Sequence, residues 1–186
     1  KAVNNGFQRL YGCFLNIGMF EFIAGAVTFF RKINRRLKPG SKVKEMLSSI
    51  LCQERKIYRS PLSYNTQVGA ALSLLGMKPE HEIALIEAGI SLPGEMDRLE
   101  SIIKPDHGIL TVISKAHIGG LGSLESILDE KRRLFKNLGP SSFLVLNADD
   151  PLSMSLASDA PCKVVTFGIS QEADVRAENL ESLPEK

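Results

Sequence analysis

Residues 123–150 read SLESILDEKRRLFKNLGPSSFLVLNADD and contain a helix pattern, a helix stop and a strand pattern in that order. Apolar side chains recur at helical spacing from Ser123 to Leu138, and Gly139-Pro140 predicts the end of that helix. The run Phe143–Leu146 is short and continuously apolar, and polar residues follow it at once. This is the pattern of a helix that leads into a buried strand of a parallel sheet.

The same alternation extends over the rest of the chain from residue 60. Short β-rich runs at Glu82–Ile86, Ile109–Ile113 and Val164–Phe167 predict further strands. Helical periods begin at Pro93 and, before this region, near Ser41. Strands that alternate with helices indicate βαβ units. The predicted fold class is therefore α/β, a three-layer, mostly parallel sheet flanked by helices.

Composition and charge narrow the class of protein. The chain has 186 residues, of which 44% are hydrophobic and 24% charged, so it is globular rather than disordered or fibrous. Residues 1–60 carry 12 Lys and Arg against 3 Asp and Glu, whereas residues 61–186 carry 11 against 18. This split predicts two pieces of different chemistry. Three cysteines without a CxxC spacing argue against a disulfide scaffold or a zinc site and favour a reducing cytosol.

The segment Leu10–Phe30 is 21 residues long, mostly apolar and followed by basic residues. Its length and flanking charge would suit a membrane helix, which makes a membrane-anchored protein one alternative. Glu21 lies in the middle of the segment, and three glycines weaken a helix there. We therefore favour a buried or poorly specified stretch.

Polar residues follow three of the predicted strands. Glu87 follows the strand at Glu82–Ile86, His117 lies beyond Ile113, and Asn147, Asp149 and Asp150 follow Leu146. Ligands of open α/β sheets bind outside the carboxyl ends of the strands. We therefore expect a ligand site there, and Glu87 and His117 suit Mg²⁺ or Mn²⁺ with phosphate oxygens. The remaining histidines, His81 and His107, are expected to be solvated or structural.

Lys131 falls within the apolar stripe of the helix from Ser123, at the spacing 124, 127, 128, 131, 135, 138. A buried ammonium is unfavourable unless it is paired, neutralised or modified. Two readings stay open: a lysine that extends to the rim, or a lysine whose chemistry is used at a metal or phosphate.

A phosphate-binding loop is the expected companion of such a sheet, and the sequence offers one candidate. Gly40, Ser41 and Lys42 stand before the helix at residues 44–51, but the usual Gly-Lys-Thr/Ser is missing. Basic residues precede them where an apolar strand would be expected. A helix cap with basic flanks is the simpler interpretation.

Several ordered motifs resemble the central, ATP-binding domain of the Mur ligase family over about residues 57–180. These motifs are RSPLSYNTQVG at 59–69, IEAGISLPGEM at 86–96, Ala116-His117, Gly122-Ser123, Lys131 and LNADDP at 146–151. Within the family, the resemblance is strongest to the UDP-N-acetylmuramoyl-tripeptide–D-alanyl-D-alanine ligases, as in the form fused to alanine racemase. The resemblance implies a P-loop-NTPase-like domain of an ATP-dependent, amide-forming ligase of peptidoglycan precursor synthesis. ATP would phosphorylate a substrate carboxylate, and an amine would then displace phosphate from the acyl phosphate.

The resemblance also implies roles for individual residues. Glu87 and His117 would bind Mg²⁺, and a carbamylated Lys131 would support a second metal ion, so that His117 and Lys131 count as catalytic. Asn147 and Asp150 would contact the adenosine of ATP, and Asn65 would lie near the substrate and the phosphates. Gly40, Ser41 and Lys42 stand where the family's phosphate loop is expected.

The departures from the family pattern define the expected domains. We expect an unassigned segment at 1–35, the central domain with a degraded phosphate loop at 36–180, and a polar tail at 181–186. The family's domains for the UDP-sugar and for the amine are not recognisable, so this chain alone is expected to be inactive. The expected partners are a nucleotide and a UDP-muramoyl-peptide in the cytoplasm, with no nucleic acid and no membrane. The alternatives are a non-catalytic nucleotide-binding or interaction remnant of the fold and, at the substrate level, a folylpolyglutamate synthase-like ligase.

Overall fold

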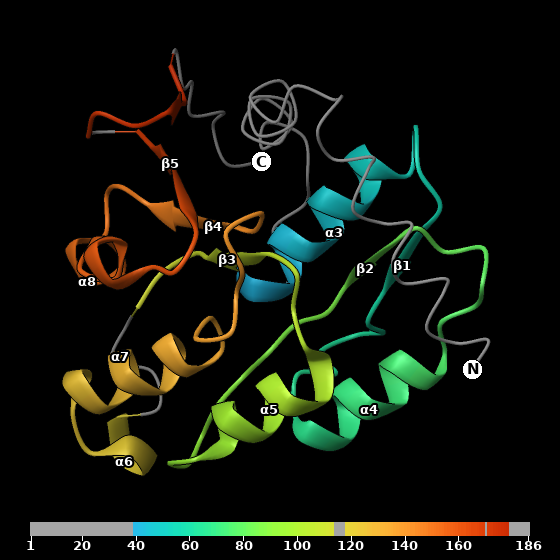
Figure 1. Ribbon diagram of the computed structural model, residues 1–186, viewed down its shortest axis with the longest axis horizontal. Helices are drawn as coiled ribbons and strands as arrows, with labels where there is room; N and C mark the ends of the chain where they lie inside the picture. Colours follow the sequence, from blue (N-terminus) through green and yellow to red (C-terminus); the bar gives the residue numbers. More distant parts are fainter. Residues whose placement is uncertain (1–38, 114–117, 170, 179–186) are drawn as a thin grey trace, which may run out of the picture.

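The computed structural model describes residues 39–113, 118–169 and 171–178 (Figure 1). Helices alternate with strands along the chain, as the sequence pattern predicts. The elements are α3 (Pro39–Leu51), β1 (Ile57–Arg59), α4 (Gln67–Leu75), β2 (Ile83–Leu85), α5 (Glu95–Ile103), β3 (Gly108–Leu110), α6 (Ile118–Leu121), α7 (Leu124–Arg133), β4 (Phe143–Asn147), α8 (Pro151–Met154), a 3₁₀ turn (Ala157–Asp159), β5 (Lys163–Gly168) and β6 (Val175–Arg176).

The strands form two parallel sheets. One has the order β1-β2, and the other has the order β3-β4-β5-β6. Every strand pair is parallel, for example Val145 of β4 beside Val165 of β5. Parallel pairs need a crossover on a sheet face, and the intervening helices supply it. The α/β class with parallel sheets and flanking helices is confirmed.

The main hydrophobic core lies between the helices and the larger sheet. Helices α4, α5 and α7 lie side by side along one edge of the view in Figure 1, and α4 and α7 both contact α5. Their inner faces and the larger sheet form a buried cluster that includes Ala70, Leu99, Ile127 and Leu146, together with Ile90 from the segment after β2. Full burial of a Leu or Ile side chain contributes about 1.5–3 kcal/mol. The β1-β2 sheet is therefore linked to this core through α4 and through the segment that follows β2.

Several predicted bounds were wrong in detail. The helix expected over residues 123–138 ends at Arg133, because the next amides bond three residues back in tighter turns that bring Phe135 and Leu138 into the core. The strand expected at Ile109–Ile113 ends at Leu110, and Ile113 instead donates its amide to Asp150.

The prediction for the Leu10–Phe30 segment concerns residues that precede the first described element. Residues 1–38, which contain the Leu10–Phe30 segment, lie outside the described residues. Within the described ranges, none of the helices is both long enough and apolar enough to cross a membrane.

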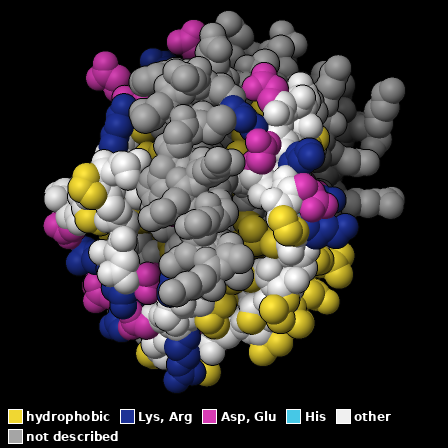
Figure 2. Space-filling model, turned by 45° about the vertical axis from the view of Figure 1, so that its right-hand side comes forward, with side chains coloured by type: hydrophobic (Ala, Val, Ile, Leu, Met, Phe, Trp, Pro, Cys, Tyr) yellow, Lys and Arg dark blue, Asp and Glu magenta, His cyan; other side chains and the backbone are white. Residues whose placement is uncertain are grey.

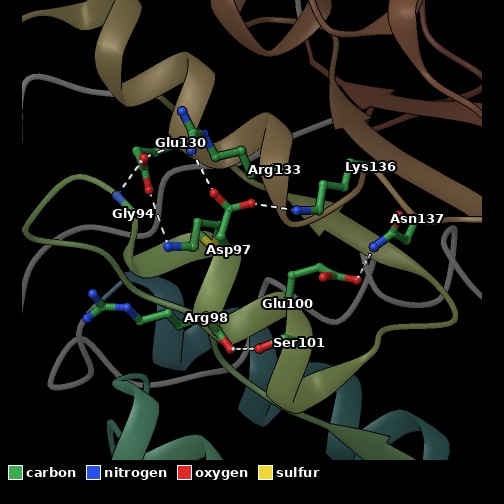
Figure 3. Close-up of polar contacts among 10 residues, drawn as sticks. Gly94, Asp97, Arg98, Glu100, Ser101, Glu130, Arg133, Lys136 and Asn137 are labelled. Carbon is green, nitrogen blue, oxygen red and sulfur yellow. Dashed lines mark hydrogen bonds and ion pairs between the residues drawn. The ribbon is translucent and has the colours of Figure 1, made fainter.

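Helices α5 and α7 are joined by polar contacts around buried Glu130 (Figure 3). Glu130 accepts hydrogen bonds from the amides of Gly94 (2.8 Å) and Met96 (3.2 Å), at the amino end of α5. Gly94 is the N-cap residue of α5 and has no side chain to offer, so Glu130 supplies the missing acceptor from the neighbouring helix. Nearby, Asp97 accepts from Arg133 and Lys136, each at 2.6 Å.

The outward face of α4 is apolar. Val68, Leu72 and Leu75 follow one another at helical spacing and are more than half exposed, as is Leu62 in the preceding loop. Figure 2 shows hydrophobic side chains gathered on this side of the molecule. The inner face of α4 instead carries the small buried residues Gly69, Ala70 and Ser73.

Candidate functional site

The carboxyl ends of β1 and β2 meet at buried Ser60. Because β1 and β2 are parallel neighbours, the loops that leave them start at the same edge. The amide of Ser60 donates to Leu85, and the amide of Glu87 donates to the Ser60 hydroxyl at 3.3 Å. These bonds fix Glu87 directly beyond the end of β2, where sequence reasoning places a ligand-binding carboxylate.

Among the described residues, Lys44 and Asn65 contact the Glu87 carboxylate. The ammonium of Lys44 lies 3.3 Å from Oε2, and the Asn65 amide donates to Oε1 at 3.4 Å. The Glu87 side chain is 18% exposed. The structure therefore brings together Glu87 and Asn65, two of the predicted site residues, and adds Lys44.

Lys44 reaches this site from the buried face of α3. Its side chain is 5% exposed, and its ammonium also donates to the Ser60 hydroxyl (3.1 Å) and to the Leu62 carbonyl (2.5 Å). An ammonium has three protons, and three acceptors surround this one. Lys44 was missed in the sequence although it shares a helix face with Leu47 and Leu51, the same signal that singled out Lys131.

Close packing of Gly89 positions Asn65. The Gly89 amide donates to the Asn65 carbonyl at 2.8 Å, and a Cβ at residue 89 would stand 2.8 Å from Asn65 Nδ2. A side chain larger than hydrogen at residue 89 would thus push the Asn65 amide from its place. Glycine at residue 89 thus leaves the space that the Asn65 amide occupies beside Glu87.

The predicted adenosine-contacting residues lie at the ends of β3 and β4. Asn147 donates to the Thr111 carbonyl at 2.9 Å and accepts from the Asp149 amide at 3.0 Å. Asp150 caps α8 through Leu152 N and also accepts from Ile113 N and from the Ser153 hydroxyl. These contacts hold the ends of two neighbouring strands together, so both side chains have a structural role at the predicted edge.

Asp149 binds the chain beyond β5. Its carboxylate accepts from the amides of Ile169 (2.6 Å) and Gln171 (2.9 Å). It therefore closes the loop between β5 and β6.

Lys131 lies on α7 and is half-buried. Loss of hydration on burial lowers the pKa of its ammonium below the ordinary 10.5. The buried residues of the helix itself are Ile127 and Glu130, so Lys131 flanks the centre of the apolar stripe. Glu130 was also missed in the sequence, although its spacing from Ile127 and Leu134 puts it on the packed face.

Other predicted site residues are only partly described. His117 lies outside the described residues. Gly40, Ser41 and Lys42 fall within the first turn of α3, which begins at Pro39. Within the described ranges, His, Cys, Asp and Glu side chains form no group of three suited to a metal ion.

The two remaining histidines have structural contacts, as expected. His81 accepts from the Lys78 amide at 2.9 Å within a turn. His107 accepts from the Phe143 amide at 3.2 Å and stacks on the Phe143 ring at 3.9 Å between centroids. Burial lowers the pKa of His107 below its ordinary 6.5.

Comparison with known proteins agrees with this arrangement. The Mur ligase middle domain matches residues 41–186. The UDP-N-acetylmuramoyl-tripeptide–D-alanyl-D-alanine ligase of Synechocystis sp. is 32% identical over 127 residues, 68% of this chain and 28% of that protein. The corresponding ligase of Bacillus subtilis is 28% identical over 74% of this chain and 29% of its own length.

Solved structures give the same result. A crystal structure of MurF from Acinetobacter baumannii matches with a TM-score of 0.70 and 27% identity, over 77% of this chain and 32% of that one. MurF ligase from Thermotoga maritima in complex with ADP matches with a TM-score of 0.63 and 28% identity, over 71% of this chain and 31% of that one. The chain thus spans about three tenths of the length of these relatives. It belongs to the Mur ligase family and contains the middle domain of the MurF-type peptidoglycan ligases.

Proposed function

We propose that this chain is the ATP-binding middle part of an ATP-dependent ligase that joins an amino-acid amine to a UDP-muramoyl-peptide carboxylate. The observation that carries the proposal is the meeting of Glu87 and Asn65 at the carboxyl ends of β1 and β2 in a domain of this family. The ADP bound to the Thermotoga maritima relative supports the nucleotide. We place the reaction in the cytoplasm, with the UDP-muramoyl-peptide and nucleotide as partners, and without nucleic acid or membrane.

The donor chemistry at Glu87 fits Mg²⁺. This ion prefers oxygen ligands, keeps several waters and is often bound through one or two carboxylates together with substrate phosphates. Glu87 offers hard oxygens in a fixed orientation, since Ser60 positions its backbone and Asn65 its carboxylate. Mg²⁺ there would neutralise charge on the phosphoryl group during transfer. We propose Glu87 and His117 as its protein ligands.

The other predicted site residues would bind and orient the substrate and the nucleotide. Asn65 would orient Glu87 and lie near the substrate carboxylate and the phosphates. Asn147 and Asp150 would face the adenosine, with contacts made by the lone pairs that their backbone bonds leave unused. Gly40, Ser41 and Lys42 would be the altered phosphate loop. The substrate carboxylate would attack the γ-phosphorus, ADP would leave, and the amine would then displace phosphate from the acyl carbon.

Lys131 is proposed to become carbamylated. Burial lowers the pKa of the amine, which raises the share of the neutral form that can attack CO₂. The new N–C bond forms as the nitrogen loses one proton to solvent, and the product carries one negative charge. A carboxylate of this kind would support a second metal ion.

A non-catalytic nucleotide-binding or interaction remnant is the second candidate. It is favoured by one observation: α3 begins at Pro39, so Gly40, Ser41 and Lys42 continue a helix without a Gly-Lys-Thr/Ser sequence. In this case the fold and its nucleotide contacts would persist without amide formation.

The test is a titration of the ¹⁵N-labelled chain with Mg-ATP, followed by amide chemical shifts and calorimetry. We expect shifts at Glu87, Asn65 and Asn147 with a dissociation constant weaker than micromolar, because the phosphate loop is degraded. Unchanged shifts at millimolar Mg-ATP would refute nucleotide binding. ADP release that depends on a UDP-muramoyl-tripeptide and D-alanyl-D-alanine would favour the ligase, and binding without turnover would favour the remnant.

A further inference from the structure

Glu87 already has a cation beside it. The ammonium of Lys44 lies 3.3 Å from the carboxylate, and both side chains are largely shielded from water, at 5% and 18% exposure. The charges of Lys44 and Glu87 offset each other in this ion pair. A divalent ion at Glu87 would bring two further positive charges close to the Lys44 ammonium, in a partly dehydrated place.

Other contacts of Lys44 hold its ammonium beside Glu87. The ammonium donates two of its three protons to the Ser60 hydroxyl and the Leu62 carbonyl, which lie in the loop after β1. These two hydrogen bonds do not depend on the Glu87 carboxylate. The buried helix α3 fixes the origin of the side chain, with Met46 and Leu47 in the core. The ammonium would therefore remain within a few ångströms of Glu87 even if a metal ion took the carboxylate.

We propose that Lys44 is an internal cation that competes with divalent metal ions for Glu87. This inference rests on the metal role of Glu87 given above. A divalent ion that takes Oε2 must displace the ammonium from that oxygen, and one that takes Oε1 is repelled by the nearby ammonium, so the ion binds weakly when it comes alone. A polyphosphate brings the negative charge that the carboxylate lacks, so metal and nucleotide bind more strongly together than apart.

The size of the effect follows from Coulomb's law. A unit charge about 5 Å from a divalent ion, in a medium as polar as water, weakens binding by about tenfold, and a less polar setting increases the factor. Removing the charge of Lys44 should therefore strengthen metal binding by about tenfold or more. A role of Lys44 as a support for Glu87 predicts the opposite sign, namely weaker binding.

The experiment is a titration with Mn²⁺ alone, read by electron paramagnetic resonance of the free ion, on the full chain. We expect Lys44→Met to bind Mn²⁺ at least about tenfold more tightly than the unmodified chain. The matched control Lys163→Met removes an exposed lysine on β5 and should leave the affinity unchanged. Adding Glu87→Gln to Lys44→Met should abolish the gain. Equal or weaker binding by Lys44→Met, or no binding by either protein, would overturn the proposal.

A second measurement needs no substitution and so does not depend on the folding of the variant. The Nζ–H₃ signal of a shielded lysine can be followed by ¹⁵N NMR during a Mg²⁺ titration. We expect the Lys44 signal to shift with the same saturation curve as the Glu87 amide. Metal binding at Glu87 with an unchanged Lys44 signal would contradict competition. Neither titration contains nucleotide, so a failure of the ATP-binding proposal is seen separately, in the Mg-ATP experiment.

Discussion

Replacement of Glu130 by alanine should destabilise the fold, although no catalytic role is predicted for this residue. Glu130 is 4% exposed and accepts the amides of Gly94 and Met96 at the amino end of α5. A hydrogen bond to a charged group contributes about 1.5–3 kcal/mol, and loss of a helix N-cap costs about 1 kcal/mol. Removing a buried carboxylate returns part of this free energy. We expect a net loss of about 3 kcal/mol.

The loss can be measured by urea unfolding followed by circular dichroism, since the chain has no tryptophan. For a domain of this size, about 3 kcal/mol corresponds to a fall in Tm of about 6–12 °C. Asp129→Ala is the matched control: it removes a 63% exposed acid next to Glu130 and should change stability by less than about 0.5 kcal/mol. Equal effects of the two substitutions would refute the capping role of Glu130.

Three further predictions concern stability. Gly120→Ala should lower the free energy of unfolding by about 2 kcal/mol or more in urea unfolding, because the new Cβ would collide with the Ser91 carbonyl. The adjacent Gly119→Ala is the control, since a Cβ there meets nothing within 4 Å. Equal losses for the two variants would contradict the packing argument. The free energy of unfolding should fall as pH drops below 6.5, because His107 takes up a proton at higher pH in the unfolded chain than in the folded chain. In His107→Phe, the free energy of unfolding should lose this pH dependence when pH 7.5 and pH 5.5 are compared. The chain should gain stability relative to Lys131→Met as pH rises towards 10.5 in CO₂-free buffer, because the folded Lys131 releases its proton earlier than the unfolded one; a flat difference between pH 7 and 10 would show an ordinary lysine.

The parallel architecture could be predicted because its strands are strongly apolar. Phe143–Leu146 and Val164–Phe167 fall within β4 and β5 of the structure. By contrast, β1 and β6 were missed, since Ile57–Arg59 and Val175–Arg176 are only three and two residues long and contain arginine. Helix α4 was missed for another reason. Its outward side chains are as apolar as its inward ones, so the sequence shows no amphipathic period there.

Some residues of the candidate site could also be predicted from the sequence, and others could not. Glu87 was predictable because a carboxylate after an apolar strand lies at a sheet edge, and the edge is where the structure has it. Asn65 came from the family resemblance alone. Ser60, which organises the site through its hydroxyl, could not be found in the sequence, since a serine at a strand end is common and only its burial marks it. Lys44 could have been found, because it is a charged residue on an otherwise apolar helix face.

The division of the strands into two sheets has a consequence for native-state motion. In the described part of the chain, β2 pairs with β1 and β3 pairs with β4, and the two sheets share no ladder. Opening of β1 and β2 together therefore breaks no backbone hydrogen bond of the larger sheet, although it removes Ala70 and Ile90 from the shared core. Amide exchange should then show two opening units, with slower exchange in β4 than in β1. Because Ser60 and Glu87 follow β1 and β2, the candidate site belongs to the less protected unit.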